Sequence, residues 1–143
     1  MTVRMTRDEN STLDIVPLSE ATKCIAAYKQ TLYEKKIAHD DILKAYLLKT
    51  RDLFEALGIA RSEFTELSHP FVRIYLGMEP DSLVNKYKLF LVPVTLDGKD
   101  DIPMGYINEG DTVEREYVYD FNTPCPKTCD RESALYKAGI VIG

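Results

Sequence analysis

The first strong pattern in the chain is that of a helix. Apolar side chains recur three and four positions apart from residue 18 onwards, which places them on one helical face. Pro17 and Ser19 suit a helix start, where backbone N–H groups lack partners and capping side chains are favoured. We therefore expect a helix from about residue 18 to Lys36, preceded by a flexible polar lead-in over residues 1–14. The apolar positions of this face are Leu18, Ala21, Ile25, Tyr28 and Leu32.

Residues 42–57 are compatible with two structures. As a single helix, they would place six apolar side chains on one face. The alternative is a strand followed by the short helix RDLFEAL, with Thr50 as its cap, Asp52 in its first turn and Gly58 just past its end. We favour the strand followed by a helix, because Thr50 and Gly58 then both have a role.

Three later segments have the patterns of strands. Residues 71–76 alternate with a period of two, as in a strand with both faces partly covered, and Gly77 is expected to end it. The run YKLFLVPVTL, residues 87–96, is largely apolar, which is typical of a strand buried on both sides. Pro93 lies inside it and requires an edge or a bulge, since proline donates no ladder hydrogen bond. Residues 113–121 alternate again.

These elements are joined by turns rather than by helical crossovers. Asp97-Gly98 is a tight-turn dipeptide, residues 99–112 have the composition of a long exposed loop, and a short helix is expected over about 130–138. The pattern predicts an α+β fold with a mainly antiparallel sheet of about four strands. The long N-terminal helix and one or two short helices should pack on one face of the sheet. A length of 143 residues suits a single domain, expected over 15–143.

Composition and charge exclude several classes of protein. Hydrophobic residues make up 45% of the chain and charged residues 29%, a balance that supports a folded core. The formal net charge of −5 disfavours nucleic acid as a partner, because it repels a phosphate backbone. The chain has no apolar run near the length of about 20 residues that crosses a bilayer, and its start lacks the apolar core of a signal peptide. We expect a cytoplasmic protein that does not enter a membrane.

The cysteines carry one candidate chemistry. Cys24, Cys125 and Cys129 are too few for a disulfide framework, so we expect thiols. Cys125 and Cys129 lie in the stiff run PCPKTC and meet only if the chain turns helically from Pro126, because extended backbone separates their Cα atoms by roughly 13 Å. They are candidates for a redox pair or for two ligands of a zinc site, which would need two more. The alternative is that they pack this corner against the core.

A second candidate site is a tyrosine-rich sheet face. Tyrosine and arginine are favoured as anchors of protein interfaces, and alternation is expected to place several of them on one face of the sheet. The same face is equally suited to lie beneath a helix. The residues concerned are Arg73, Tyr75, Arg115, Tyr117 and Tyr119.

Three segments of the second half of the chain, FVRIYLGM, KLFLVPVTLDGKDDI and YVYDFNTPCPKTCD, resemble a group of small uncharacterised bacterial proteins. In that group an Arg-x-Tyr-x-Gly strand, a Val-Pro-Val strand ending in a polar turn and a Cys-Pro-rich tail follow one another. The resemblance implies the strand and then the helix for residues 42–57. It implies no activity, so no functional residue is carried over.

The sequence contains no recognised catalytic set. His39 and His69 lie near neither a serine nor a cysteine at a catalytic spacing. We therefore expect a non-enzymatic protein-binding or assembly module that recognises a protein partner or forms a homo-oligomer. One alternative is a thiol-redox or metal protein that uses Cys125 and Cys129. Another is a small ligand binder or enzyme whose acidic residues, such as Asp120 and Asp130, gather only in the fold.

The thiol and metal alternative makes a direct prediction. Protein purified without chelator should carry bound metal, or Cys125 and Cys129 should react with a thiol reagent faster than Cys24, because only an activated thiolate is a strong nucleophile. Metal analysis and timed labelling measure both. Metal-free protein whose three thiols label slowly and equally would exclude this alternative.

Overall fold

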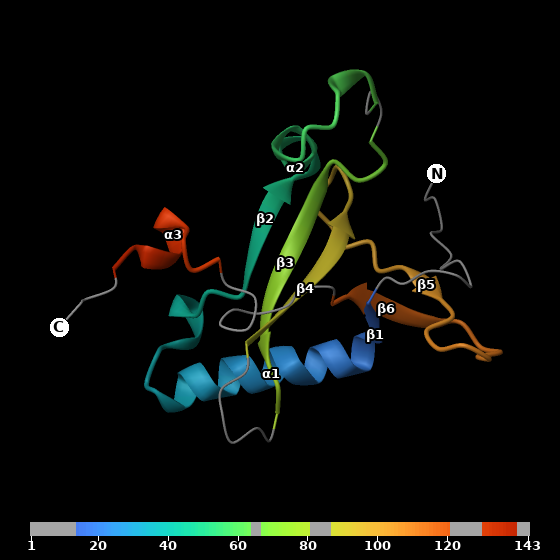
Figure 1. Ribbon diagram of the computed structural model, residues 1–143. Coiled ribbons are helices and arrows are strands. Elements are labelled where there is room, and N and C mark those ends of the chain that lie inside the picture. Colours follow the sequence, from blue (N-terminus) through green and yellow to red (C-terminus); the bar gives the residue numbers. More distant parts are fainter. Residues whose placement is uncertain (1–13, 64–66, 81–86, 121–129, 140–143) are drawn as a thin grey trace.

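The computed structural model describes residues 14–63, 67–80, 87–120 and 130–139 and has an α+β fold (Figure 1). The strands are β1 (Ile15–Pro17), β2 (Ala45–Lys49), β3 (Phe71–Met78), β4 (Tyr87–Val94), β5 (Met104–Gly105) and β6 (Arg115–Tyr119). The α-helices are α1 (Leu18–Glu34), α2 (Thr50–Ala56) and α3 (Ala134–Lys137), and short 3-10 helices span His39–Asp41 and Arg61–Glu63.

The strands form one sheet in which all pairings are antiparallel. Its order is β1-β6-β4-β3-β2, and β5 pairs with β6 outside this path. The prediction of an antiparallel sheet is confirmed, but about four strands is too few. The two missed strands are β1 and β5, which have three and two residues. Such short segments cannot display an alternation of period two.

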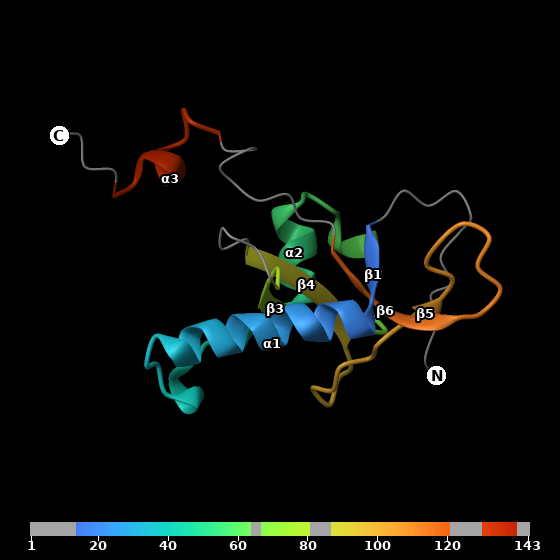
Figure 2. The same ribbon diagram turned by 90° about the horizontal axis from the view of Figure 1, so that it is seen from below.

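Helix α1 lies across one face of the sheet (Figures 1 and 2). The helical period predicted it correctly. Ala21 of the predicted face is buried, together with the neighbouring Cys24, in a cluster with Phe90, Val92 and Val118. Pro17 occupies the N-cap position of the helix. No side chain caps the helix start, so Ser19 does not act as a cap. At the far end, the Tyr28 hydroxyl donates to the backbone oxygen of Leu43 at 2.7 Å. This bond ties the helix to the segment that enters β2.

The helix and the sheet approach each other closely at Gly77. A Cβ atom on this residue would lie 2.7 Å from the Phe90 ring and 3.3 Å from the backbone of Cys24. Gly77 was expected to end its strand, and this is wrong, because β3 continues to Met78. The glycine is instead needed inside the strand, since only a residue without a side chain lets α1 come this near.

The strand and then the helix predicted over residues 42–57 are confirmed as β2 and α2. Gly58 follows the helix with a φ of 78°, in the left-handed region that glycine adopts most readily. The predicted cap is wrong: Lys49 occupies the N-cap position, and Thr50 is the first helical residue. The Thr50 hydroxyl donates instead to the backbone oxygen of His69 at 2.7 Å. It thereby joins the start of α2 to the segment before β3.

Pro93 lies inside β4 without breaking its pairing to β3. It sits opposite Val72, and its carbonyl accepts from the Asp101 N–H at 2.9 Å, on the side away from β3. Because the N–H and C=O of one strand residue point the same way, the missing donor costs no bond to β3. The chain then reverses at Asp97-Gly98, as predicted, and the expected loop 99–112 contains β5.

The short helices depart from the prediction that all helices pack on one face. Helix α2 lies at the end of the sheet beside β2 and β3, and α3 stands away from the strands in both views (Figures 1 and 2). Residues 1–13 of the expected lead-in lie outside the described residues. Among the described helices, none is both long and apolar enough to cross a membrane.

The close approach at Gly77 predicts a specific effect of adding one methyl group. Gly77→Ala should lower the free energy of unfolding by about 1–3 kcal/mol, because overpacking strains a tight core. Phe90→Leu removes the ring that the methyl group would meet, so the double variant should lose less stability than the sum of the two single losses. Urea denaturation of all four proteins measures this coupling. Additive losses would contradict the contact.

Candidate functional site

The residues of the predicted tyrosine-rich face lie on both faces of the sheet. Tyr119 is paired with Leu91, and Leu91 with Ile74, so Tyr119 shares a face with Ile74. Arg73 and Tyr75 flank Ile74 in β3 and therefore point to the other face. The prediction of one common face is wrong, because the register between strands, and not alternation within them, decides which faces coincide.

Tyr117 and Tyr119 cannot anchor a partner at the surface. They are 2% and 9% exposed and pack edge to face, with ring centroids 5.7 Å apart, in a cluster with Ile107. Arg115, at the start of the same strand, is exposed. The two tyrosines therefore belong to the core between the sheet and the loop that contains β5.

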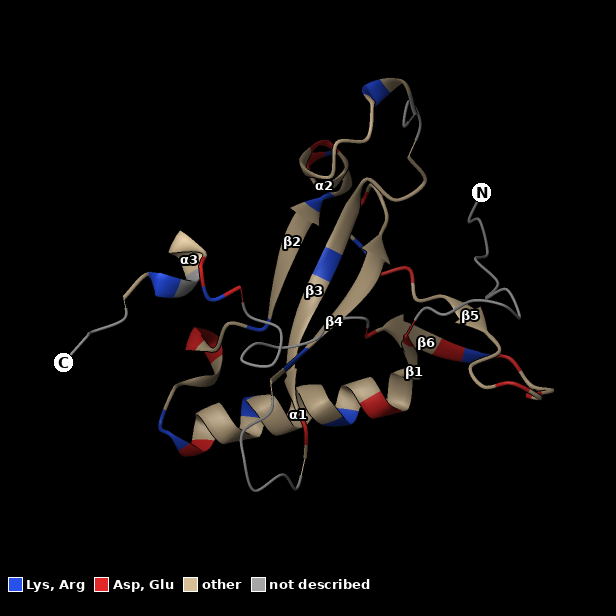
Figure 3. Cartoon of the chain, in the orientation of Figure 1, with Lys and Arg blue, Asp and Glu red and all other residues tan. Residues whose placement is uncertain are grey.

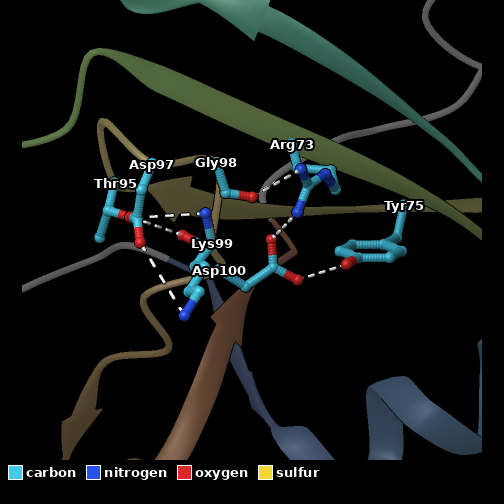
Figure 4. A network of polar contacts seen from close by, with 7 residues as sticks. All are labelled: Arg73, Tyr75, Thr95, Asp97, Gly98, Lys99 and Asp100. Atoms are coloured by element: carbon cyan, nitrogen blue, oxygen red, sulfur yellow. Dashed lines mark hydrogen bonds and ion pairs between the residues drawn. The ribbon is translucent and has the colours of Figure 1, made fainter.

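Arg73 and Tyr75 meet Asp100, which lies in the segment predicted to be an exposed loop, residues 99–112. Both carboxylate oxygens of Asp100 are used, since Arg73 Nη1 donates to Oδ1 and the Tyr75 hydroxyl donates to Oδ2 (Figure 4). Arg73 Nη2 also donates to the Gly98 backbone oxygen at 3.1 Å. Burial raises the pKa of the Tyr75 phenol, and its hydrogen bond to Asp100 raises it further. We name Arg73, Tyr75 and Asp100 the hairpin brace, because they fasten the turn at Asp97-Gly98 to β3.

The other polar contacts of interest are separate from the hairpin brace. His69 Nε2 lies 2.7 Å from Asp101 Oδ2, which fixes the segment before β3 to the same loop. Asp120 forms an ion pair with Lys88 at 2.8 Å. Asp130 accepts from the Glu132 N–H in the turn before α3. Asp120 and Asp130 therefore have different partners, Asp120 on β4 and Asp130 within its own turn.

The structure leaves the thiol prediction open. Cys125 and Cys129 lie outside the described residues, so their spacing stays a prediction. Cys24 is buried against the sheet, and burial raises the pKa of its thiol despite the opposing effect of Lys88. In the described part of the chain no group of three or more metal-ligating side chains is found.

An open pocket of about 390 Å³ lies where β2 meets α2. Its walls are mainly apolar, with Pro70, Phe71 and Leu96 among them, and Lys49 and Arg51 add positive charge. The pocket therefore adjoins one end of β2, the last strand in the order of the described sheet.

Strand β2 forms an edge of the sheet with unused hydrogen-bonding groups. The Leu76 N–H donates to Lys44 O at 3.0 Å and the Thr50 N–H donates to Pro70 O at 2.9 Å, so the even-numbered residues face β3. Backbone groups of alternate residues point to opposite sides of a strand. Those of Ala45, Leu47 and Lys49 therefore point outward, and no hydrogen bond across this edge is found among the described residues.

The side chains along this edge are unusually apolar for exposed positions. Tyr46 is 53% exposed on one face and Leu47 is 51% exposed on the other. Natural sheets protect their edges with short strands, proline or charge. The opposite edge follows this rule, since β1 has three residues and ends at Pro17. In β2 only Lys49 is charged, at its end. We name Ala45–Lys49 with its outward backbone groups the open edge.

Sequence reasoning found the strand but missed the site. Residues 42–49, ILKAYLLK, are predicted as a strand because Thr50 and Gly58 then both have a role, and nothing local to them shows that the strand has a neighbour on one side only in the described sheet. Comparison with protein-family models, with curated proteins and with solved structures found no match. The candidate site is therefore argued from geometry.

The hairpin brace predicts a marked loss of stability on removal of one acceptor. Asp100→Asn leaves an amide nitrogen where an oxygen accepted, so Arg73 or Tyr75 loses its partner. We expect the free energy of unfolding to fall by about 1–3 kcal/mol. Glu109→Gln, an exposed acid in the same stretch of chain, is the matched control and should change it by less than about 0.5 kcal/mol. Chemical denaturation compares them, and equal effects would contradict the brace.

Proposed function

We propose that this chain is a non-enzymatic protein-binding module that recognises its partner by adding a strand to the open edge. In strand addition, the backbone of the incoming segment completes the ladder of the sheet, and side-chain contacts on both faces give specificity. The observation that carries the proposal is the outward backbone of Ala45, Leu47 and Lys49, flanked by the exposed Tyr46 and Leu47.

The burial of apolar surface favours a protein partner over solvent at this edge. Backbone groups at an edge are satisfied by water, and pairing them releases that water while it buries apolar side chains beside them. Fully burying a side chain of the size of leucine contributes about 1.5–3 kcal/mol. Tyr46 and Leu47 are each half exposed, so pairing would bury apolar surface on both faces of β2. While the edge is in contact with solvent, these two side chains stay half exposed and this free energy of burial is not realised.

The pocket beside α2 supports the same proposal. It opens at the end of β2 where Lys49 lies, and it combines apolar walls with positive charge. A strand bound along the open edge would end near this pocket, which would then hold an apolar or acidic side chain. The proposal places this binding in the cytoplasm. The likeness to the small bacterial group and the thiol or metal role of Cys125 and Cys129 remain separate predictions.

The proposal predicts that blocking one outward N–H abolishes partner capture. In Leu47→Pro the ring replaces the N–H that points away from β3, so the sheet's own ladder is kept. Immobilised wild-type protein, Leu47→Pro and the control Val113→Lys are exposed to an extract of the source cells, and retained proteins are identified by mass spectrometry. We expect at least one protein retained by the wild type and the control and lost with Leu47→Pro.

The control also replaces an exposed apolar side chain by lysine, because Val113 is 68% exposed and precedes β6, which β4 and β3 separate from the open edge. Circular dichroism and thermal unfolding establish that each variant is folded, and Leu47→Lys serves as a second edge variant. If the wild type and both edge variants retain the same proteins, the proposal is wrong.

A further inference from the structure

The open edge is built so that it can pair with itself. We propose that its occupant is a second copy of this chain, joined by antiparallel pairing of the two β2 strands about a twofold axis at Leu47. This inference rests on the proposed function and names its partner. The joined sheets would form one continuous sheet through the dimer.

The positions of the outward groups define the pairing. An isologous contact requires that a residue and its partner exchange roles between the two copies. The register that pairs all five residues of β2 sets Leu47 opposite Leu47 and Ala45 opposite Lys49. In this register Ala45, Leu47 and Lys49 all form hydrogen-bonded pairs, so every outward backbone group of the strand finds an acceptor or a donor.

The side chains agree with this register on both faces. On one face the two exposed Leu47 side chains become neighbours. On the other, Tyr46 of each copy lies opposite Leu48 of its partner, an aromatic and aliphatic pair of the kind that stabilises sheets. The ammonium group of Lys49 lies across from the methyl group of Ala45. No like charges are placed in direct opposition within the strand.

The charges at the two ends of the edge are complementary. Asp40 and Asp41 are exposed just before β2, whereas Lys49 and Arg51 are exposed where β2 meets α2. Figure 3 shows red before the strand and blue at its junction with α2. Antiparallel pairing brings the acidic end of one copy towards the basic end of the other, twice over. Lys44 lies between these ends, and its ammonium group already donates to the His39 backbone oxygen at 3.2 Å.

The test combines the oligomeric state with directed cross-linking. Sedimentation equilibrium of the full chain should give a monomer and dimer in a concentration-dependent balance for the wild type and for Val113→Lys. Leu47→Pro and Leu47→Lys should be monomeric at the highest concentration reached. The lysine variant would place two ammonium groups opposite each other and leaves the backbone donor intact, so it tests the pairing without proline.

Cross-linking then tests the register. In a background of Cys125→Ser and Cys129→Ser, with Cys24 buried, Leu47→Cys should form an intermolecular disulfide on mild oxidation. Hydrogen-bonded antiparallel residues have Cα atoms about 5.5 Å apart, which a disulfide spans. Ala45→Cys alone should not link, since the two copies of residue 45 would be about 14 Å apart. A mixture of Ala45→Cys with Lys49→Cys should link.

The outcomes separate this inference from the proposed function. A wild type that stays monomeric, a dimer that the Leu47 variants leave intact, or Ala45→Cys linking as fast as Leu47→Cys would each overturn the inference. If the wild type is monomeric and Leu47→Pro still loses a different captured protein, strand addition stands and only the self-pairing falls. If the Leu47 variants change neither capture nor association, both are wrong.

Discussion

The fold depends on one close contact, the approach of α1 to β3 at Gly77. The absent side chain lets the backbone of Cys24 and the ring of Phe90 meet over the strand, and this sets the helix over β3, β4 and β6. A helix held there packs mainly against the middle of the sheet and against β1. Strand β2 lies beyond β3 at the end of the described sheet, and the Tyr28 hydroxyl bonds to the segment that enters it. The open edge follows from the strand order, because β2 is the last strand of the described sheet and the helix covers a face of the sheet, not this edge.

The remaining contacts hold the sheet rigid around that edge. The hairpin brace fixes the turn at Asp97-Gly98 against β3, and the contact of His69 with Asp101 fastens the segment before β3 to the same loop. Thr50 adds a bond from the start of α2 to His69. Because β3 is held along its length, β2 presents its outward groups in a fixed geometry. A fixed edge loses little conformational entropy when another strand is added.

Local patterns predicted the elements well and their relations poorly. The period of α1 and the roles of Gly58 and Asp97-Gly98 depend on neighbours within a few residues, and these were correct. Gly77 was misjudged because its reason is a helix that lies far away in the sequence. Tyr117 and Tyr119 were misjudged because alternation shows which residues of one strand share a face, but not how that face matches another strand. The open edge was missed for the same reason, since strand order is a property of the whole sheet.

Hydrogen exchange along β2 tests the central claim that a second copy completes this edge. We expect the amides of Tyr46 and Leu48, which face β3, to exchange slowly at every protein concentration. Those of Ala45, Leu47 and Lys49 should exchange rapidly in dilute solution and slow down as the concentration rises, because pairing then occupies them. Exchange at these three amides that is independent of concentration would contradict the account.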